Sequence, residues 1–158
     1  MLDISVSALY PANELSNLAK HEFIFDGVRC GSMEGLLQSL KFQDVEKQIA
    51  IAAMWGTGAK FRGAKKAWYN DQTLYWKGVP FSRHSEAYQN LLDNAYDELF
   101  VQSESFRKAL TSSGNTVLCH SIGHNDPMRT ILTVEEFLCR MKRLRSLLSA
   151  ANQSDAPR

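Results

Sequence analysis

The chain has 158 residues, of which 44% are hydrophobic and 22% charged, and its formal net charge is +1. This composition predicts one globular domain with a sizeable buried core. The near-neutral charge excludes the broad basic field that drives tight nonspecific binding to nucleic acid, and leaves only local basic patches open. No apolar run approaches the roughly 18 residues that a membrane-spanning helix needs.

Cysteine usage and the N-terminus both favour a cytoplasmic protein. Residues 1–5 show no basic region followed by an apolar core, so no secretory signal is expected. Cys30, Cys119 and Cys139 are odd in number, widely separated and without metal-type spacing. They are typical of free thiols in a reducing compartment, and we expect Cys119 and Cys139 on buried elements.

The first third of the chain predicts short strands and two helices. A strand is expected within residues 4–9, and residues 21–30 alternate around Asp26-Gly27, which predicts a β-hairpin with a type I′ turn. Ser32 is a good N-cap for the helix that follows. Asp44 can cap a second helix, which is expected to end in the turn-prone residues 56–58.

The rest of the chain predicts an irregular segment and three further helices. Residues 59–82 are expected to be irregular, and helices are expected over about residues 85–100 and 104–110. After a turn at 112–115, residues 116–120 form the second strand candidate. Thr133 and Glu136 have capping-box spacing and open the last helix. We therefore expect an α+β fold: a helix-rich single domain over residues 1–150 with a small antiparallel sheet, and a polar tail at 151–158.

Residues 31–42 are the most informative segment. Glu34, Gln38 and Lys41 stand at i, i+4 and i+7 beside an apolar stripe, as in the wall of a cleft. The helix dipole favours the carboxylate form of Glu34, and a Lys in a partly desolvated pocket can attack an aldehyde carbon. The alternative is a surface ion pair on an ordinary amphipathic helix. The apolar stripe comprises Met33, Leu36, Leu37 and Leu40.

Residues 55–63 combine glycines, cations and aromatic residues. Their backbone N–H groups could approach a diphosphate that Lys60 or Arg62 neutralises, with an aromatic ring such as that of Trp68 stacking on a base. The segment lacks the P-loop spacing. A packed loop without ligand is the alternative interpretation.

His120, His124 and Asp126 follow the second strand candidate and suggest either a metal site or a proton relay. Gly123 and Pro127 disfavour the helix that would bring both histidines to one face, so we expect no metal. No nucleophile-elbow motif supports Ser-His-Asp catalysis. The basic residues between 140 and 145 predict a solvated helix face, or alternatively a contact with phosphate or nucleic acid.

Several of these segments resemble motifs of the NADAR (YbiA-like) family. They span Leu15 to Asp126 and follow one another in the same order as the motifs of the family. Ser32-Met33-Glu34 with Gln38 and Lys41-Phe42 resembles the core motif: Ser-x-Glu, a Gln four residues after the Glu, and Lys-Phe. Residues 15–18 are similar to the family's Leu-Ser-Asn-Phe motif, and residues 23–27 to the hairpin that follows it. Residues 59–68 are similar to the Ala-Lys block with its later Trp, and residues 113–126 to the closing segment of the family pattern.

The resemblance implies a YbiA-like fold and an N-glycosidase acting on ADP-ribosyl or related nucleoside N-glycosidic bonds. Guanine-linked ADP-ribose is the favoured substrate, free or on modified nucleic acid, and a riboflavin-pathway intermediate is the alternative. It implies no metal, redox cofactor or membrane. By position it implies catalytic roles for Glu34, Lys41 and Asp126. The implied substrate-binding residues are Ser16, Asn17, Gln38, Ala59, Lys60 and Trp68.

Three departures from the family pattern leave the substrate less determined than the fold. Leu18 stands where the family has Phe, Gly35-Leu36 replaces a more polar pair, and residues 127–130 replace Trp-Gly-x-Gly. A divergent, phage-borne member would show such changes. Two other functions stay open: a non-catalytic module that binds ADP-ribose or a nucleotide, and an adaptor that uses the basic helix.

Overall fold

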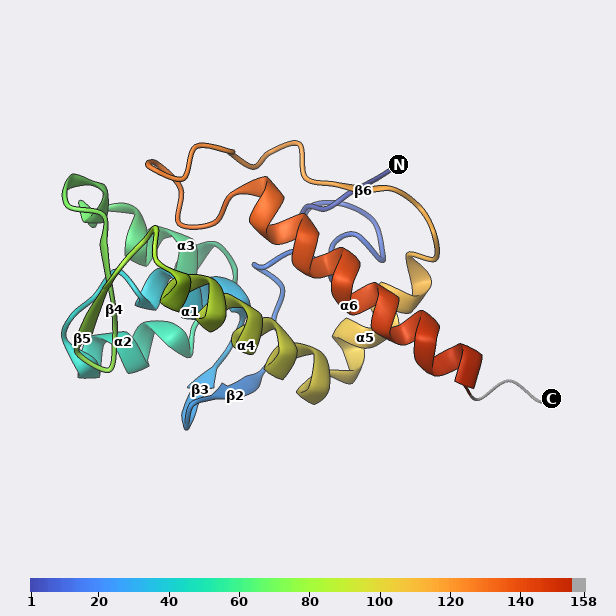
Figure 1. The fold of residues 1–158 in the computed structure, drawn as a ribbon, viewed down its shortest axis with the longest axis horizontal. Helices are drawn as coiled ribbons and strands as arrows, with labels where there is room; N and C mark the ends of the chain where they lie inside the picture. Colours follow the sequence, from blue (N-terminus) through green and yellow to red (C-terminus); the bar gives the residue numbers. More distant parts are fainter. Residues whose placement is uncertain (155–158) are drawn as a thin grey trace.

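In the computed structural model, which describes residues 1–154, helix α1 (Met33–Ser39) is packed among three other helices (Figure 1). It contacts α2 (Val45–Ala52), α3 (Gly56–Ala64) and α4 (Glu86–Gln102). Ser32 caps it as predicted, because its Oγ accepts the Gly35 N–H at 2.9 Å. The apolar stripe is buried as expected: Met33, Leu36, Leu37 and Leu40.

Close packing against the end of α2 accounts for the glycine that follows the Glu34 motif. A Cβ atom on Gly35 would lie 2.5 Å from the Met54 carbonyl oxygen, and one on Gly31 would lie 2.2 Å from that of Ala53. Both distances are far below a normal contact. Glycine at these two positions therefore lets α1 lie directly on the carbonyl end of α2.

Three two-stranded sheets replace the single small sheet that the sequence predicts. Strands β2 (Phe23–Phe25) and β3 (Val28–Cys30) form the predicted hairpin, with positive φ at Asp26 and Gly27 as a type I′ turn requires. Strands β4 (Thr73–Trp76) and β5 (Val79–Ser82) form a second antiparallel hairpin. The expected strand at 4–9 is wrong: β1 (Leu2–Asp3) precedes it and pairs in parallel with β6 (Leu118–Cys119).

The irregular segment predicted for residues 59–82 is also wrong. Gly56 begins α3 instead of ending a helix, and a 3-10 turn, η1 (Trp68–Asn70), leads from α3 to the β4–β5 hairpin. The hairpin signal is Lys77-Gly78 between two runs rich in aromatic and β-branched residues, and both turn residues have positive φ. Glycine at 56 and 58 does not end a helix here, because packing overrides the low helix propensity of glycine.

Helices α4 and α6 (Val134–Ser154) lie side by side and are joined through α5 (Glu104–Ser112) (Figure 1). Their apolar faces are buried, apart from Leu91 on α4 and Leu138 and Leu148 on α6, which are only partly covered. α6 continues to Ser154, so the predicted tail begins inside this helix, and residues 155–158 lie outside the described part of the chain. No helix among the described residues is long and apolar enough to cross a membrane.

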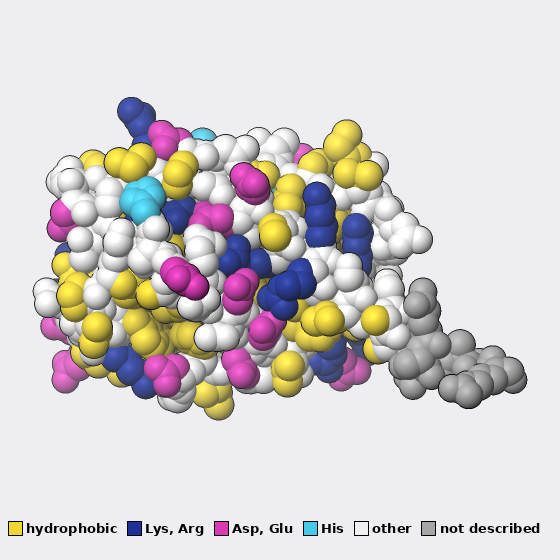
Figure 2. All heavy atoms as spheres, viewed as in Figure 1, with side chains coloured by type: hydrophobic (Ala, Val, Ile, Leu, Met, Phe, Trp, Pro, Cys, Tyr) yellow, Lys and Arg dark blue, Asp and Glu magenta, His cyan; other side chains and the backbone are white. Residues whose placement is uncertain are grey.

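Of the four basic residues of α6 between 140 and 145, Lys142 is exposed as the sequence predicts, but the three arginines do not form a solvated face. Arg140 is buried and pairs with Asp93 of α4 at 3.1 Å, while Arg143 pairs with Asp97 at 2.8 Å. Arg145 donates to the Thr116 carbonyl at 2.8 Å. Figure 2 shows basic and acidic side chains side by side where α4 and α6 meet. These guanidinium groups therefore join elements of the fold and are largely occupied, which weakens the adaptor interpretation.

The three thiols are unpaired and differ in exposure. Cys30 is buried, and burial raises the pKa of its thiol to about 12. Cys119 is half-buried. Cys139 is exposed on α6, so the expectation that it lies on a buried element is wrong.

A buried ion pair joins the end of β5 to the start of α6. Arg83 is 1% exposed, and its guanidinium donates to both Glu136 carboxylate oxygens, at 2.6 and 3.1 Å. Its Nε donates to the Thr130 carbonyl at 3.1 Å. Glu136 completes the predicted capping box, because it accepts the Thr133 N–H at 2.8 Å while Thr133 Oγ1 accepts the Glu136 N–H. The pair thereby holds residues 130–133 in one conformation.

This pair should make stability depend on acid pH. Burial alone would raise the pKa of Glu136, but hydrogen bonds from Arg83, Thr133 and Gln89 lower it from 4.5 to about 2. The stabilisation is thus present above pH 4.5 and lost as pH falls through about 2. It amounts to about 3 kcal/mol, or about 2 kcal/mol after allowance for partial solvent access. The free energy of unfolding of wild type and of Glu136→Gln can be measured in urea from pH 7 to pH 2. The difference between the two free energies should shrink by this amount as the pH falls. A difference that is independent of pH would contradict the role of the charged pair.

Candidate active site

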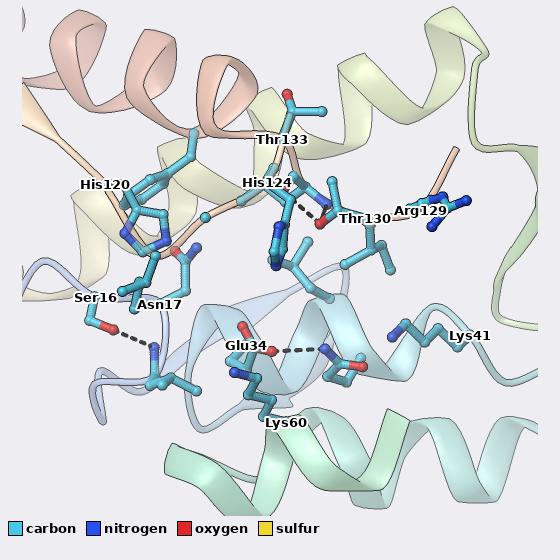
Figure 3. Close-up of a pocket in the computed structure, with 18 of the residues that line it drawn as sticks. Ser16, Asn17, Glu34, Lys41, Lys60, His120, His124, Arg129, Thr130 and Thr133 are labelled. Atoms are coloured by element: carbon cyan, nitrogen blue, oxygen red, sulfur yellow. Dashed lines mark hydrogen bonds between the residues drawn. The ribbon is translucent and has the colours of Figure 1, made fainter. Parts of the chain in front are cut away.

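A cavity of about 230 Å³ opens between α1 and the segment of residues 120–133 (Figure 3). One wall, the α1 wall, carries side chains of α1 together with Lys60 of α3. The opposite wall, the 120–133 wall, is irregular backbone that ends at the start of α6. The N-terminal loop closes one end with Ser16 and Asn17, and Trp68 of η1 also contributes.

The Glu34 carboxylate is held in place on the α1 wall. Glu34 is the second residue of α1, and its backbone N–H donates to the Asn17 carbonyl at 2.9 Å. Its Oε1 accepts a hydrogen bond of 2.8 Å from Gln38 Nε2, while Oε2 has no hydrogen-bond partner among the described residues. At this position the helix dipole favours negative charge. One carboxylate oxygen is therefore oriented by the protein and the other is left for a ligand.

Gln38 is itself positioned by a close contact between α1 and α3. The side chain is buried, and its Oε1 has no hydrogen-bond partner in the described structure. A Cβ atom on Gly63 would lie 1.8 Å from this oxygen. Only glycine at position 63 lets the Gln38 amide fit between the helices and face Glu34.

The Lys41 amine lies farther along the same helix stripe and is partly buried. Its Nζ is 3.4 Å from the Gly63 carbonyl oxygen, at the long end of the hydrogen-bond range. Burial lowers the pKa of Lys41, because it penalises the ammonium form, and the nearby Glu34 carboxylate offsets part of this shift. More of the amine is therefore neutral and nucleophilic at neutral pH than in an exposed lysine.

The other polar side chains at this end of the cavity are anchored from behind. Asn17 Oδ1 accepts the hydroxyl hydrogen of the wholly buried Tyr96 at 2.8 Å, and burial raises the pKa of Tyr96, which keeps it a donor. Ser16 Oγ accepts the Leu18 N–H at 3.2 Å. Lys60 is exposed at the mouth, whereas Trp68 is buried and shows the cavity only a small part of its surface.

Of the nine residues that the sequence singled out, seven line this cavity and two do not. Ala59 is completely buried inside α3. Asp126 is exposed: its Oδ1 accepts the Met128 N–H at 3.0 Å and its Oδ2 lies 3.7 Å from Arg129 Nε. Arg129, three residues later, reaches the cavity instead. The lining residues are Ser16, Asn17, Glu34, Gln38, Lys41, Lys60 and Trp68.

Comparison with known proteins places the chain in a family. Residues 9–146 match the sequence profile of the family described as bacteriophage protein GP30.3. The chain belongs to this family. A similar protein of Enterobacteria phage T4, the "Uncharacterized 17.1 kDa protein in Gp30-rIII intergenic region", is 41% identical over 149 residues, which cover 93% of this chain and 98% of the phage T4 protein.

The fold of this GP30.3-family protein is similar to that of YbiA from E. coli. The two structures have a TM-score of 0.61 over 100% of this chain and 92% of the YbiA chain, with 16% sequence identity. At this identity the likeness shows the fold alone. The expected YbiA-like α+β fold is confirmed. The sequence profile that this chain matches is that of the bacteriophage GP30.3 family.

Sequence reasoning missed most of the 120–133 wall. His120, His124, Arg129, Thr130 and Thr133 all line the cavity. The sequence indicates the two histidines only as candidates for a metal site or a proton relay. Among the described residues, no three His, Cys, Asp or Glu side chains are grouped to hold a metal. The signal for Arg129 and Thr130 was their place in the stretch that departs from the NADAR pattern.

The close contact at Gly63 can be tested with a matched glycine of the same helix. Gly63→Ala should cost about 1–3 kcal/mol, because the new Cβ atom must displace the Gln38 amide. In Gly58→Ala the new Cβ atom would lie 3.5 Å from Met54 Cε, which is an ordinary contact. This variant should be up to about 1 kcal/mol more stable than wild type, because alanine has the higher helix propensity. Urea unfolding measures both. Equal stability of the two variants would show that Gly63 is not needed to position Gln38.

Proposed function

We propose that this protein is an N-glycosidase that acts on ADP-ribosyl or related nucleoside N-glycosidic bonds. The observation that supports it most is the Glu34 carboxylate, held through one oxygen by Gln38 and directed with the other into a small cavity that also contains the Lys41 amine. Cleavage of an N-glycosidic bond builds positive charge on the sugar ring. A fixed carboxylate in a partly desolvated site stabilises that charge without having to reorient.

Lys41 supplies a nucleophile for the second half of the reaction. Its lowered pKa increases the fraction of neutral amine. This amine can bond to C1 of the sugar cation that forms as the nucleobase leaves with the electron pair of the C1–N bond. The ring then opens to a Schiff base on Lys41 while the amine proton passes to the departed base, and one water molecule hydrolyses the Schiff base to the free sugar and free lysine. Glu34 assists throughout as the counter-charge of the cationic species. No metal or redox cofactor enters this scheme.

The cavity size suits the reacting sugar better than a complete dinucleotide. Its volume of about 230 Å³ is below the 300–1,000 Å³ of typical ligand pockets. The ribosyl group would occupy the interior beside Ser16 and Asn17, and a diphosphate would lie at the mouth near Lys60 and Arg129. Asp126 would then act indirectly, through its contact with Arg129. The two cations at the mouth suit the diphosphate of an ADP-ribosyl substrate, free or on nucleic acid.

Glu34→Gln should abolish turnover and leave the fold nearly unchanged, because the substitution keeps the shape and removes the charge. The expected loss is at least about a hundredfold in kcat, or roughly 3 kcal/mol. Release of ADP-ribose from ADP-ribosylated guanosine measures it. Glu46→Gln is the control, since Glu46 is an exposed glutamate in the first turn of α2. If Glu34→Gln still turns over substrate, or if wild type binds ADP-ribose without cleaving any substrate, the protein is a binding module.

Lys41 variants separate covalent from electrostatic roles. Borohydride should trap sugar on wild type and on Lys65→Ala, an exposed-lysine control, but not on Lys41→Ala, because reduction fixes only a lysine Schiff base. Lys41→Arg keeps the positive charge and cannot form the imine, so its turnover should be lost as well. Intact-mass spectrometry detects the adduct. Full activity in Lys41→Arg would leave Lys41 as an electrostatic group and remove the Schiff-base step.

A further inference from the structure

The His120 ring is fixed in one tautomer on the cavity wall. Its Nδ1 lies 2.7 Å from the Ile4 carbonyl oxygen. A carbonyl oxygen only accepts hydrogen bonds, so Nδ1 carries the hydrogen, and in the neutral ring Nε2 carries the lone pair. Nε2 has no hydrogen-bond partner among the described residues. Any polar contact of this ring with a ligand must therefore be made by Nε2 as an acceptor.

Packing also prevents the ring from turning away. The Phe137 ring meets it edge to face at a centroid distance of 5.3 Å. On another side the backbone of Gly123 lies so close that a Cβ atom there would be 2.6 Å from His120 Cδ2. His124 differs, since it is exposed and its side chain makes no hydrogen bond with the described residues. Figure 3 shows both rings on the 120–133 wall, opposite α1.

The proposed reaction lacks a base, and His120 is suited to that role. Glu34 must stay charged beside the sugar, and Lys41 is consumed as the nucleophile. A group that accepts a proton from water is still required for hydrolysis, and an oriented neutral imidazole is the side chain most often used for it. Among the cavity-lining side chains, His120 combines an available acceptor nitrogen with a fixed orientation.

We infer that His120 is a catalytic base of this site, an assignment that rests on the proposed function. Nε2 takes a proton from the water molecule whose oxygen forms the bond to C1. The C1–N bond breaks and its electron pair leaves on nitrogen, which receives the proton from Nε2. The departing nitrogen belongs to the nucleobase in direct hydrolysis and to Lys41 when the sugar is released from the lysine. One water is consumed and His120 returns to its neutral form.

His120→Asn separates the catalytic from the structural role. The Asn amide can donate to the Ile4 carbonyl in place of Nδ1–H but offers nothing in place of Nε2. Its kcat should fall between about a hundredfold and ten-thousandfold, with Tm and ADP-ribose affinity close to wild type. His84→Asn is the matched control, because His84 is exposed, is bonded to Gln72 and does not line the cavity. It should keep full activity.

Chemical rescue provides the second readout. Imidazole added to His120→Ala can enter the space left by the ring and should restore kcat at least tenfold, which it cannot do for Glu34→Gln. If His120→Asn retains activity within threefold of an active wild type, the base assignment is wrong and the glycosidase proposal stands. Loss of activity in both His120 variants without rescue by imidazole also overturns the assignment, in favour of a structural role. An inactive wild type overturns the proposed function and this inference together.

Discussion

The cavity exists because one buried ion pair holds its irregular wall. Taking a guanidinium and a carboxylate out of water is costly, and such a pair is stable only when nearly all its hydrogen-bonding groups are satisfied. Here Glu136 accepts from Arg83 twice, from Gln89 and from the Thr133 N–H, and Arg83 also binds the Thr130 carbonyl. This set of bonds admits one arrangement. It sets residues 130–133 opposite α1.

The opposite wall depends on close contacts between backbones. Glycines at 31, 35 and 63 allow α1 to lie against the end of α2 and against α3 at distances that any side chain would prevent. The Gln38 amide is confined by this packing and directs the Glu34 carboxylate. Both walls are therefore rigid for different reasons, one electrostatic and one steric. Preorganisation of this kind is what lets a charged group stabilise a transition state at no reorganisation cost.

The similarity to YbiA is a similarity of fold, because two proteins with 16% sequence identity can share a fold and differ in chemistry. The functional argument rests on the site itself. One of the three departures from the NADAR pattern, residues 127–130, lies in the 120–133 segment, which contributes Arg129, Thr130 and two histidines to the cavity. In the proposed reaction the acid and the amine come from α1, and the opposite wall contributes a cation and an imidazole.

What the sequence by itself determined is local. Ser32, Asp44, Ser85 and the Thr133–Glu136 box cap helices, and Asp26-Gly27 turns a hairpin, because each device acts between residues at most four apart. The Glu34–Gln38 contact was predictable for the same reason. Only the tertiary structure decided that β1 pairs with β6, that Arg83 finds Glu136 53 residues away, and that Arg129 rather than Asp126 reaches the cavity. Helical periodicity is set by backbone geometry, whereas the partner of a long charged side chain is set by which distant segments pack together.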